Sequence, residues 1–185
     1  LTPVVGEGED TLVDSFWAAP SIVVTPSRIY ATYQLGGPSE IRVFDPKGKP
    51  LGAPKQLEVA AAAGLTPLSG EAVLFEHWSF VESPAWYHFD AATNETRKTQ
   101  LVTTSPVDLR QTEVVREMAV SKDGTRVPVN ILMPAGAALD GKTPAVVNGY
   151  GGYGVSITPR YRATYGVLLE QGVIYAIANL RGGGE

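Results

Sequence analysis

The chain has 185 residues, 44% of them hydrophobic, which is ordinary for a globular protein and enough for one domain or parts of two. The net charge of −4 and the isoelectric point near 5.2 argue against nucleic acid or an anionic membrane surface as the main partner. Because the chain has no cysteine, it holds neither a disulfide framework nor a thiolate metal site.

The sequence carries no visible membrane or targeting segment. No apolar run approaches the roughly 18 residues that would span a bilayer. The first residues, LTPVVGEGED, include neither an initiator methionine nor a basic stretch followed by an apolar one. We therefore expect a soluble protein, cytoplasmic or periplasmic, and the sequence does not distinguish between these compartments.

Up to about residue 104 the sequence is typical of short strands separated by turns rich in Gly, Pro and Ser. The connections GGPSE, DPKGKP and VESPA have the composition of hairpin turns. The predicted strands are residues 21–25, 28–35, 40–45, 72–80 and 85–90.

The predicted strand AVLFEHWSF carries apolar residues on both of its faces. Val73 and Phe75 lie on one face because they are two residues apart. Leu74 and Trp78 lie on the other. Such a strand suits a position between two layers, as in a β-sandwich or a propeller blade. No period of 40 to 50 residues is evident, so repeats alone do not establish a propeller.

After about residue 112 the sequence changes character. Residues 114–121 and 127–133, joined by the turn KDGT, predict a hairpin. Residues 145–150 predict a strand, and the continuous apolar run 173–180 predicts a strand that is buried on both faces.

A helix is expected between these last two strands. Tyr161, Tyr165 and Leu169 recur at helical spacing, with Pro159 near the expected start and Gly172 just past the end. Strand, glycine-rich loop, helix and strand form a βαβ unit, which indicates an α/β sheet. An all-β segment therefore leads into the beginning of an α/β domain.

The loop of this unit, VNGYGGYGVS, matches the dinucleotide-binding pattern G-x-G-x-x-G at Gly149, Gly151 and Gly154. A nucleotide site is disfavoured, because VSITP separates the loop from the helix and Arg181 stands where an acidic ribose ligand is required. Two interpretations remain. The glycines serve only a tight turn, or they form part of a catalytic loop at the carboxyl end of a strand, where ligands bind in α/β sheets.

Two long stretches at matching separation, VNGYGGYGVSITPRY and AIANLRGGGE, closely resemble the prolyl oligopeptidase family of serine peptidases. The hairpin VSKDGTRVPVNILMPAG and the strands LFEHWSFVESPAWYHFD are also similar to that family. The resemblance is strong over about residues 70–185 and diffuse before them.

The resemblance implies a β-propeller that caps an α/β-hydrolase catalytic domain, with the active site between them. Residues 1–111 are then the last blades of the propeller and a linker. Residues 112–185 are then the first part of the peptidase domain, truncated before the nucleophile.

The resemblance also implies roles for two tyrosines. Tyr150 donates its hydroxyl to the oxyanion of the tetrahedral intermediate, and Tyr153 helps to wall the pocket for the proline side of the substrate. Many relatives carry Phe at the position of Tyr153. Arg181 and Glu185 lie beside the active site in the family, and we expect a structural role for both.

The chain contains no complete catalytic triad. Acyl transfer by this route requires a serine on a G-x-S-x-G elbow, an acid and a histidine in that order, and no serine here has that context. These residues are expected beyond Glu185. His77 and His88 fall in predicted strands, where local hydrogen bonds are expected to satisfy them, and they lack a third metal ligand.

Three further types of residue are assigned to structure. Asp123 is expected to serve its turn. Trp17, Trp78 and Trp86 are expected to pack in the core.

The resemblance implies a serine peptidase that cleaves short peptides after proline, gated by its propeller and without cofactor or metal. The 185-residue chain alone is expected to be inactive. Its expected partners are short proline-containing peptides, not nucleic acid or membrane, and the full-length protein is expected to be a monomer. Two alternatives stay open. One is an oligopeptidase that cuts after basic residues, and the other is a non-catalytic propeller module that binds peptides.

Overall fold

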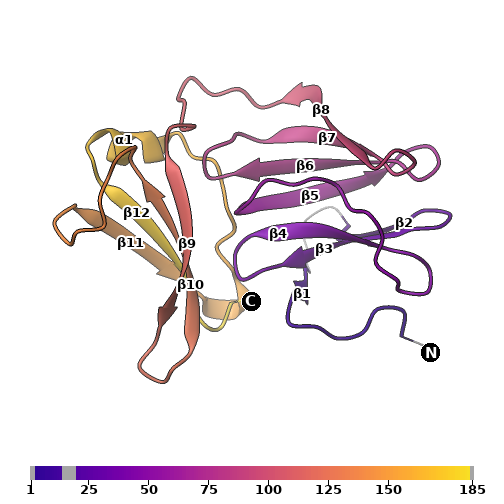
Figure 1. The fold of residues 1–185 in the computed structure, drawn as a ribbon, viewed down its shortest axis with the longest axis horizontal. Helices are drawn as coiled ribbons and strands as arrows, with labels where there is room; N and C mark the ends of the chain where they lie inside the picture. Colours follow the sequence, from indigo (N-terminus) through magenta and orange to yellow (C-terminus); the bar gives the residue numbers. More distant parts are fainter. Residues whose placement is uncertain (1–2, 14–19, 184–185) are drawn as a thin grey trace.

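The computed structural model describes residues 3–13 and 20–183, so Trp17 and Glu185 lie outside the described residues. Over these ranges the chain forms three four-stranded sheets, one short α-helix and one 3-10 helix. The first and second sheets, β1–β4 and β5–β8, lie together in one half of the molecule. The third sheet, β9–β12, forms the other half with α1 (Figure 1).

The first sheet is built around a central strand. Its strands are β1 (Thr11–Leu12), β2 (Ile22–Val24), β3 (Ile29–Gln34) and β4 (Ser39–Phe44). Both β1 and β2 pair with one side of β3, and β4 pairs with its other side, all antiparallel.

The second sheet is an antiparallel meander, as expected for a propeller blade. Its strands are β5 (Ala60–Pro67), β6 (Val73–Ser79), β7 (Ala85–Asp90) and β8 (Glu95–Val102), paired in chain order. The five strands predicted up to residue 104 are confirmed as β2, β3, β4, β6 and β7.

The first and second sheets share one apolar core. The aromatic rings of Tyr30, Phe75 and Phe89 are fully buried in it, with Ile41 and Val43 of β4 beside them. The rings of Tyr30 and Phe89 meet edge to face, with centroids 6.3 Å apart. Because these rings come from β3, β6 and β7, the core joins the two sheets into one layered unit.

The third sheet is mixed. Its strands are β9 (Glu113–Val120), β10 (Arg126–Met133), β11 (Ala145–Tyr150) and β12 (Ile174–Asn179). Their order across the sheet is β11-β12-β10-β9, and β11 runs parallel to β12 while the other pairs are antiparallel. The helix α1 (Thr164–Glu170) connects β11 to β12, so the predicted βαβ unit is confirmed.

The predicted start of this helix is wrong. The helix begins at Thr164 rather than near Pro159, because the preceding residues make contacts with the other half of the molecule. The Pro159 carbonyl accepts a hydrogen bond from Trp78 Nε1 (2.7 Å), and the Tyr161 hydroxyl bonds to Ser105 Oγ (3.0 Å). The helix ends before Gly172 as predicted, with that glycine at φ +72°.

Residues from both halves form a second apolar core. Phe80, which follows β6, packs with Leu132 of β10, Leu169 of α1 and Ile177 of β12. Residues 103–112 lead from β8 to β9, and Leu109 within them is buried in the same core. The division into domains 1–111 and 112–185 stays a prediction.

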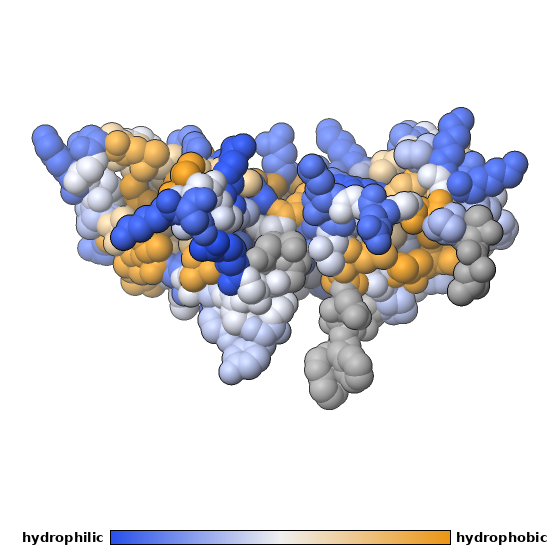
Figure 2. All heavy atoms as spheres, turned by 90° about the horizontal axis from the view of Figure 1, so that it is seen from below, coloured by the Kyte–Doolittle hydropathy of each residue, from blue (hydrophilic) through white to orange (hydrophobic). Residues whose placement is uncertain are grey.

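The two described tryptophans pack against neighbours without full burial. Trp78 and Trp86 are both half-buried, and the ring of Trp86 lies against Gly64 at φ +67°. On the surface seen in Figure 2, apolar side chains show on both halves of the molecule. None of the helices in the described part of the chain is long and apolar enough to cross a membrane.

Candidate active-site loop

Tyr150 is the last residue of β11, at the carboxyl end of a parallel strand pair. It lies opposite Asn179, the last residue of β12, and its side chain is 46% exposed. The sequence prediction that Tyr150 stands at a strand end is therefore confirmed. Ligands in α/β sheets bind at this end of the strands.

Beyond Tyr150 the chain lies directly against the residues that follow β12. A Cβ on Gly151 would stand 2.1 Å from the Leu180 carbonyl oxygen, so no other residue fits without displacing backbone. The Gly154 N–H donates to the Gly182 carbonyl (2.9 Å), and the Leu180 N–H donates to the Tyr150 carbonyl (3.3 Å). The glycine loop, residues 150–154, and the RGG loop, residues 180–183, are therefore joined through their backbones.

The side chain of Tyr150 folds over its own loop. A Cβ on Gly152 would stand 3.1 Å from the Tyr150 hydroxyl oxygen, so glycine at this position leaves room for the ring. The short helix η1 (Gly152–Gly154) holds Tyr153 at φ 58°, a conformation that is uncommon for residues other than glycine. Tyr153 is 99% exposed. One tyrosine thus covers the loop and the other projects into solvent.

The geometry explains the glycines without a nucleotide. After η1 the residues up to Ala163 are not helical, and α1 begins only at Thr164. A dinucleotide loop requires a helix that opens at the glycines, so that its amides face the phosphates. Gly151 and Gly152 are instead needed for close contacts with Leu180 and with the Tyr150 ring.

Arg181 makes an ion pair that was not predicted from the sequence. Its Nη1 lies 2.5 Å from Asp123 Oδ2 and 3.3 Å from Thr125 Oγ1. The Arg181 guanidinium holds the pKa of the Asp123 carboxyl well below its usual range, with help from the Thr125 N–H. Asp123 also serves the β9–β10 turn, as predicted. The partners are 58 residues apart, and no local pattern signals their contact.

The two histidines lie away from this loop, in β6 and β7. His77 is buried between the rings of Phe75 and Tyr87, and burial lowers its pKa to about 4. The expectation that local hydrogen bonds satisfy it is wrong for Nε2, which has no partner among the described residues, because its neighbours are aromatic. Among these residues no group of three His, Asp or Glu side chains is placed to hold a metal ion.

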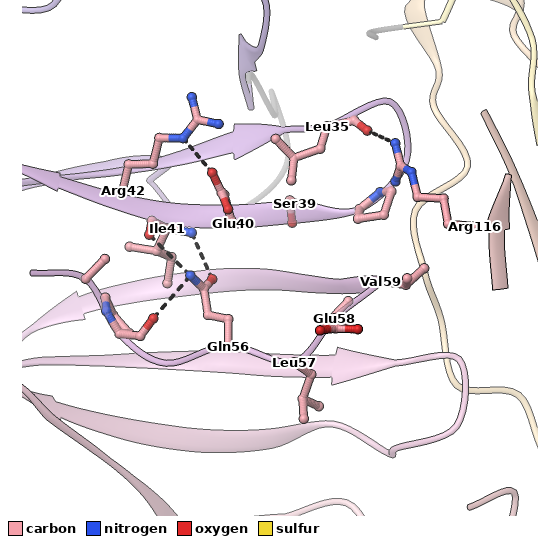
Figure 3. Close-up of a pocket in the computed structure, with 14 residues that line it drawn as sticks. Leu35, Ser39, Glu40, Ile41, Arg42, Gln56, Leu57, Glu58, Val59 and Arg116 are labelled. Carbon is pink, nitrogen blue, oxygen red and sulfur yellow. Dashed lines mark hydrogen bonds and ion pairs between the residues drawn. The ribbon is translucent and has the colours of Figure 1, made fainter. Parts of the chain in front are cut away.

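A groove of about 700 Å³ lies elsewhere, between β4 and residues 53–60 (Figure 3). Gln56 crosses it and completes the edge of β4: the Ile41 N–H donates to Gln56 Oε1 (2.8 Å), and Gln56 Nε2 donates to the Ile41 carbonyl (3.2 Å). Neither Tyr150 nor Tyr153 lines this groove. The volume of this groove is therefore no reason to regard it as the candidate active site.

The fold is shared with peptidases of known structure. A solved prolyl endopeptidase superposes with a TM-score of 0.82 and 29% identity, over 98% of this chain and 26% of that one. Oligopeptidase B from Leishmania major superposes with a TM-score of 0.74 over 97% of this chain and 26% of its own, but at 18% identity it shows the fold alone. Both halves of the molecule thus have counterparts in one type of peptidase chain.

Sequence comparison leads to the same group. The chain is 30% identical over 159 residues to the prolyl endopeptidase of Elizabethkingia miricola, a match that covers 84% of this chain and 22% of that relative. No family model matches. The chain belongs to the prolyl oligopeptidase family of serine peptidases. It spans less than a quarter of the length of the curated prolyl endopeptidases that it matches.

Proposed function

We propose that the protein containing this chain is a serine peptidase that cleaves short peptides after proline. The first and second sheets belong to a β-propeller that gates access, and the third sheet begins the α/β-hydrolase domain. The nucleophile, acid and histidine come from outside these 185 residues, so the chain alone is expected to hydrolyse nothing. The relatives named as prolyl endopeptidases support the specificity.

One observation carries the catalytic part of this proposal: Tyr150, a half-exposed tyrosine, lies at a strand end on a loop whose backbone is hydrogen-bonded to the RGG loop. As a serine attacks the scissile carbonyl, negative charge develops on its oxygen. Donors that already point at that position stabilise the charge without reorganisation. Tyr150 is suited to be such a donor, because the contacts of Gly151 with Leu180 hold the backbone from which its side chain extends.

Tyr153 is assigned to the substrate. Its ring is almost fully exposed and is held away from the loop by a left-handed backbone conformation. An aromatic face in this position offers apolar contact to a proline ring. We assign Tyr153 to the wall of the proline pocket, where it contributes to binding rather than to the chemical step.

Substitution of Tyr150 by Phe in the full-length peptidase tests the assignment. The change keeps the ring and removes the donor, so kcat for a fluorogenic Gly-Pro peptide is expected to fall on the order of ten- to a thousandfold, about 1.4–4 kcal/mol. KM is expected to change less, because the bond strengthens mainly in the transition state.

Tyr175→Phe is the matched control. It removes the hydroxyl of a half-buried tyrosine in β12, the strand that pairs with β11. It is expected to retain kcat. Full kcat in Tyr150→Phe together with a loss in Tyr153→Ala would show that the two roles are reversed. Turnover of substrates cut after a basic residue, without turnover of Gly-Pro peptides, would contradict the proline specificity.

A further inference from the structure

The position of Tyr150 depends on the RGG loop, residues 180–183. The Leu180 carbonyl fills the space next to Gly151 Cα, and two backbone hydrogen bonds join residues 150 and 154 to residues 180 and 182. A Cβ on Gly182 would in turn stand 2.7 Å from the Gly151 carbonyl oxygen. With contact this close, a shift of either loop moves the other.

The RGG loop is held from its other side by the turn between β9 and β10. This turn is well defined: the Ser121 N–H donates to the Thr125 carbonyl (2.8 Å), and the Gly124 N–H donates to the Ser121 carbonyl (2.9 Å). Asp123 is fixed within it, because its Oδ1 accepts the Thr125 N–H (3.1 Å). The other carboxylate oxygen, Oδ2, accepts a hydrogen bond from Arg181 Nη1. The turn thus presents one oriented carboxylate to the RGG loop.

Stability alone gives a poor account of this ion pair. The side chains of Arg181 and Asp123 are 59% and 51% exposed, and exposed pairs contribute only about 0–1 kcal/mol to folding. The pair does restrict where the RGG loop lies, since it ties Arg181 to a turn of a neighbouring strand. Arg181 also lowers the pKa of the Asp123 carboxyl, as expected for a carboxylate that accepts a hydrogen bond from a guanidinium.

We propose that the Asp123–Arg181 ion pair is a positioning device for the oxyanion donor. It anchors the RGG loop to the β9–β10 turn, and the RGG loop fixes the glycine loop that carries Tyr150. Asp123 and Arg181 are positioning residues, because neither contacts the reacting atoms in this scheme. The inference rests on the proposed function of Tyr150.

Asp123→Asn in the full-length peptidase removes the charge and keeps an oxygen that can accept the Thr125 N–H. We expect kcat on a Gly-Pro peptide to fall about three- to tenfold with KM within about twofold, since a misplaced donor weakens the transition state and not the bound ground state. The melting temperature is expected to change by no more than about 2 °C, as for an exposed pair. Arg181→Met is expected to lower kcat as much as Asp123→Asn does, and Arg181→Lys is expected to lower it less.

Asp108→Asn is the matched control. Asp108 Oδ1 accepts the N–H of the residue two positions on (3.0 Å), and its Oδ2 pairs with Arg110 Nη2 (2.6 Å). This pair is exposed to a similar degree, 55% for Asp108 and 75% for Arg110, but it lies between β8 and β9, away from the two loops. Its loss is expected to leave kcat unchanged.

A double variant separates positioning from a general effect. If the pair acts through Tyr150, then Asp123→Asn combined with Tyr150→Phe is no slower than Tyr150→Phe alone. Multiplicative losses would overturn the inference, because the pair would then act on something else. Full kcat in Asp123→Asn, with a loss in Tyr150→Phe, would also overturn it and leave the proposed function standing. Full kcat in Tyr150→Phe would overturn the proposed function first.

Discussion

The two halves of the molecule bury their strands in different ways. In the first and second sheets, Tyr30, Phe75 and Phe89 are fully buried in a core that the two sheets close between them. In the third sheet all six residues of β11 are exposed, and Val147 is 71% exposed. The tyrosine that we assign to chemistry ends this exposed strand. Within these 185 residues the first and second sheets thus enclose their aromatic rings, whereas β11 lies at the edge of the third sheet (Figure 1).

The largest change in the free energy of unfolding is expected when the closed core is disrupted. Phe75→Ala in the 185-residue chain is expected to lower the free energy of unfolding by about 3–5 kcal/mol, because it leaves a cavity among buried aromatic rings. Val147→Ala on β11 is expected to cost less than about 0.5 kcal/mol, since its side chain is exposed. Urea denaturation of both variants measures the difference. Equal losses would remove the contrast between the two halves.

A smaller effect is expected from pH within that core. Burial lowers the pKa of His77 from 6.5 to about 4, so between these values the unfolded chain binds more protons than the folded one. Stability is therefore lost as pH falls through this window, by up to about 3 kcal/mol. Free energies of unfolding at about pH 7.5 and about pH 4.5, which span most of this window, give the greater part of the change.

His77→Gln removes this titration and is expected to flatten the pH dependence. His88→Gln is the control, because that residue is half-buried in β7 rather than enclosed by rings. If wild type and His77→Gln lost the same free energy between the two pH values, the pH sensitivity would have to be assigned to other groups.

The smallest effect concerns a contact between the halves. Arg116 of β9 is half-buried and donates to the carbonyls of Leu35 and Gly36 in the β3–β4 turn. Arg116→Met is expected to lower the free energy of unfolding by about 1–2 kcal/mol, the range for hydrogen bonds from charged groups. Arg126→Met, at an exposed position on β10, is the control. Hydrogen exchange on Arg116→Met should show the two halves opening more independently than in wild type; unchanged exchange would mean that other contacts hold them.

Strands rich in β-branched and aromatic residues were predictable, whereas the two-residue strand β1 and the longer strands β5 and β8 were not. β5 begins with four alanines, which favour no strand by propensity, yet Ala60 and Ala61 are buried where small side chains let the layers approach. β8, ETRKTQLV, is largely polar because it lies at the edge of the second sheet. In both strands tertiary position outweighed local preference.

The site was predictable to the same limited extent. Tyr150 at a strand end follows from the apolar run before it and the glycines after it. The reason for Gly151 does not, because the Leu180 carbonyl that excludes a side chain there comes from another segment. The pairing of Asp123 with Arg181 likewise depends on β10 lying beside β12. Contacts between distant segments leave no trace in a local pattern.

Gln56 occupies backbone groups at the edge of β4 that could otherwise pair with a strand of another copy of this chain. A strand edge with free N–H and C=O groups can recruit a strand from another molecule and begin an aggregate. By bonding both backbone groups of Ile41, the Gln56 side chain occupies that position on β4 with a group that cannot extend into a further strand. One amide side chain thus occupies the two backbone groups that an incoming strand would need at this position, beside the groove that lies along β4.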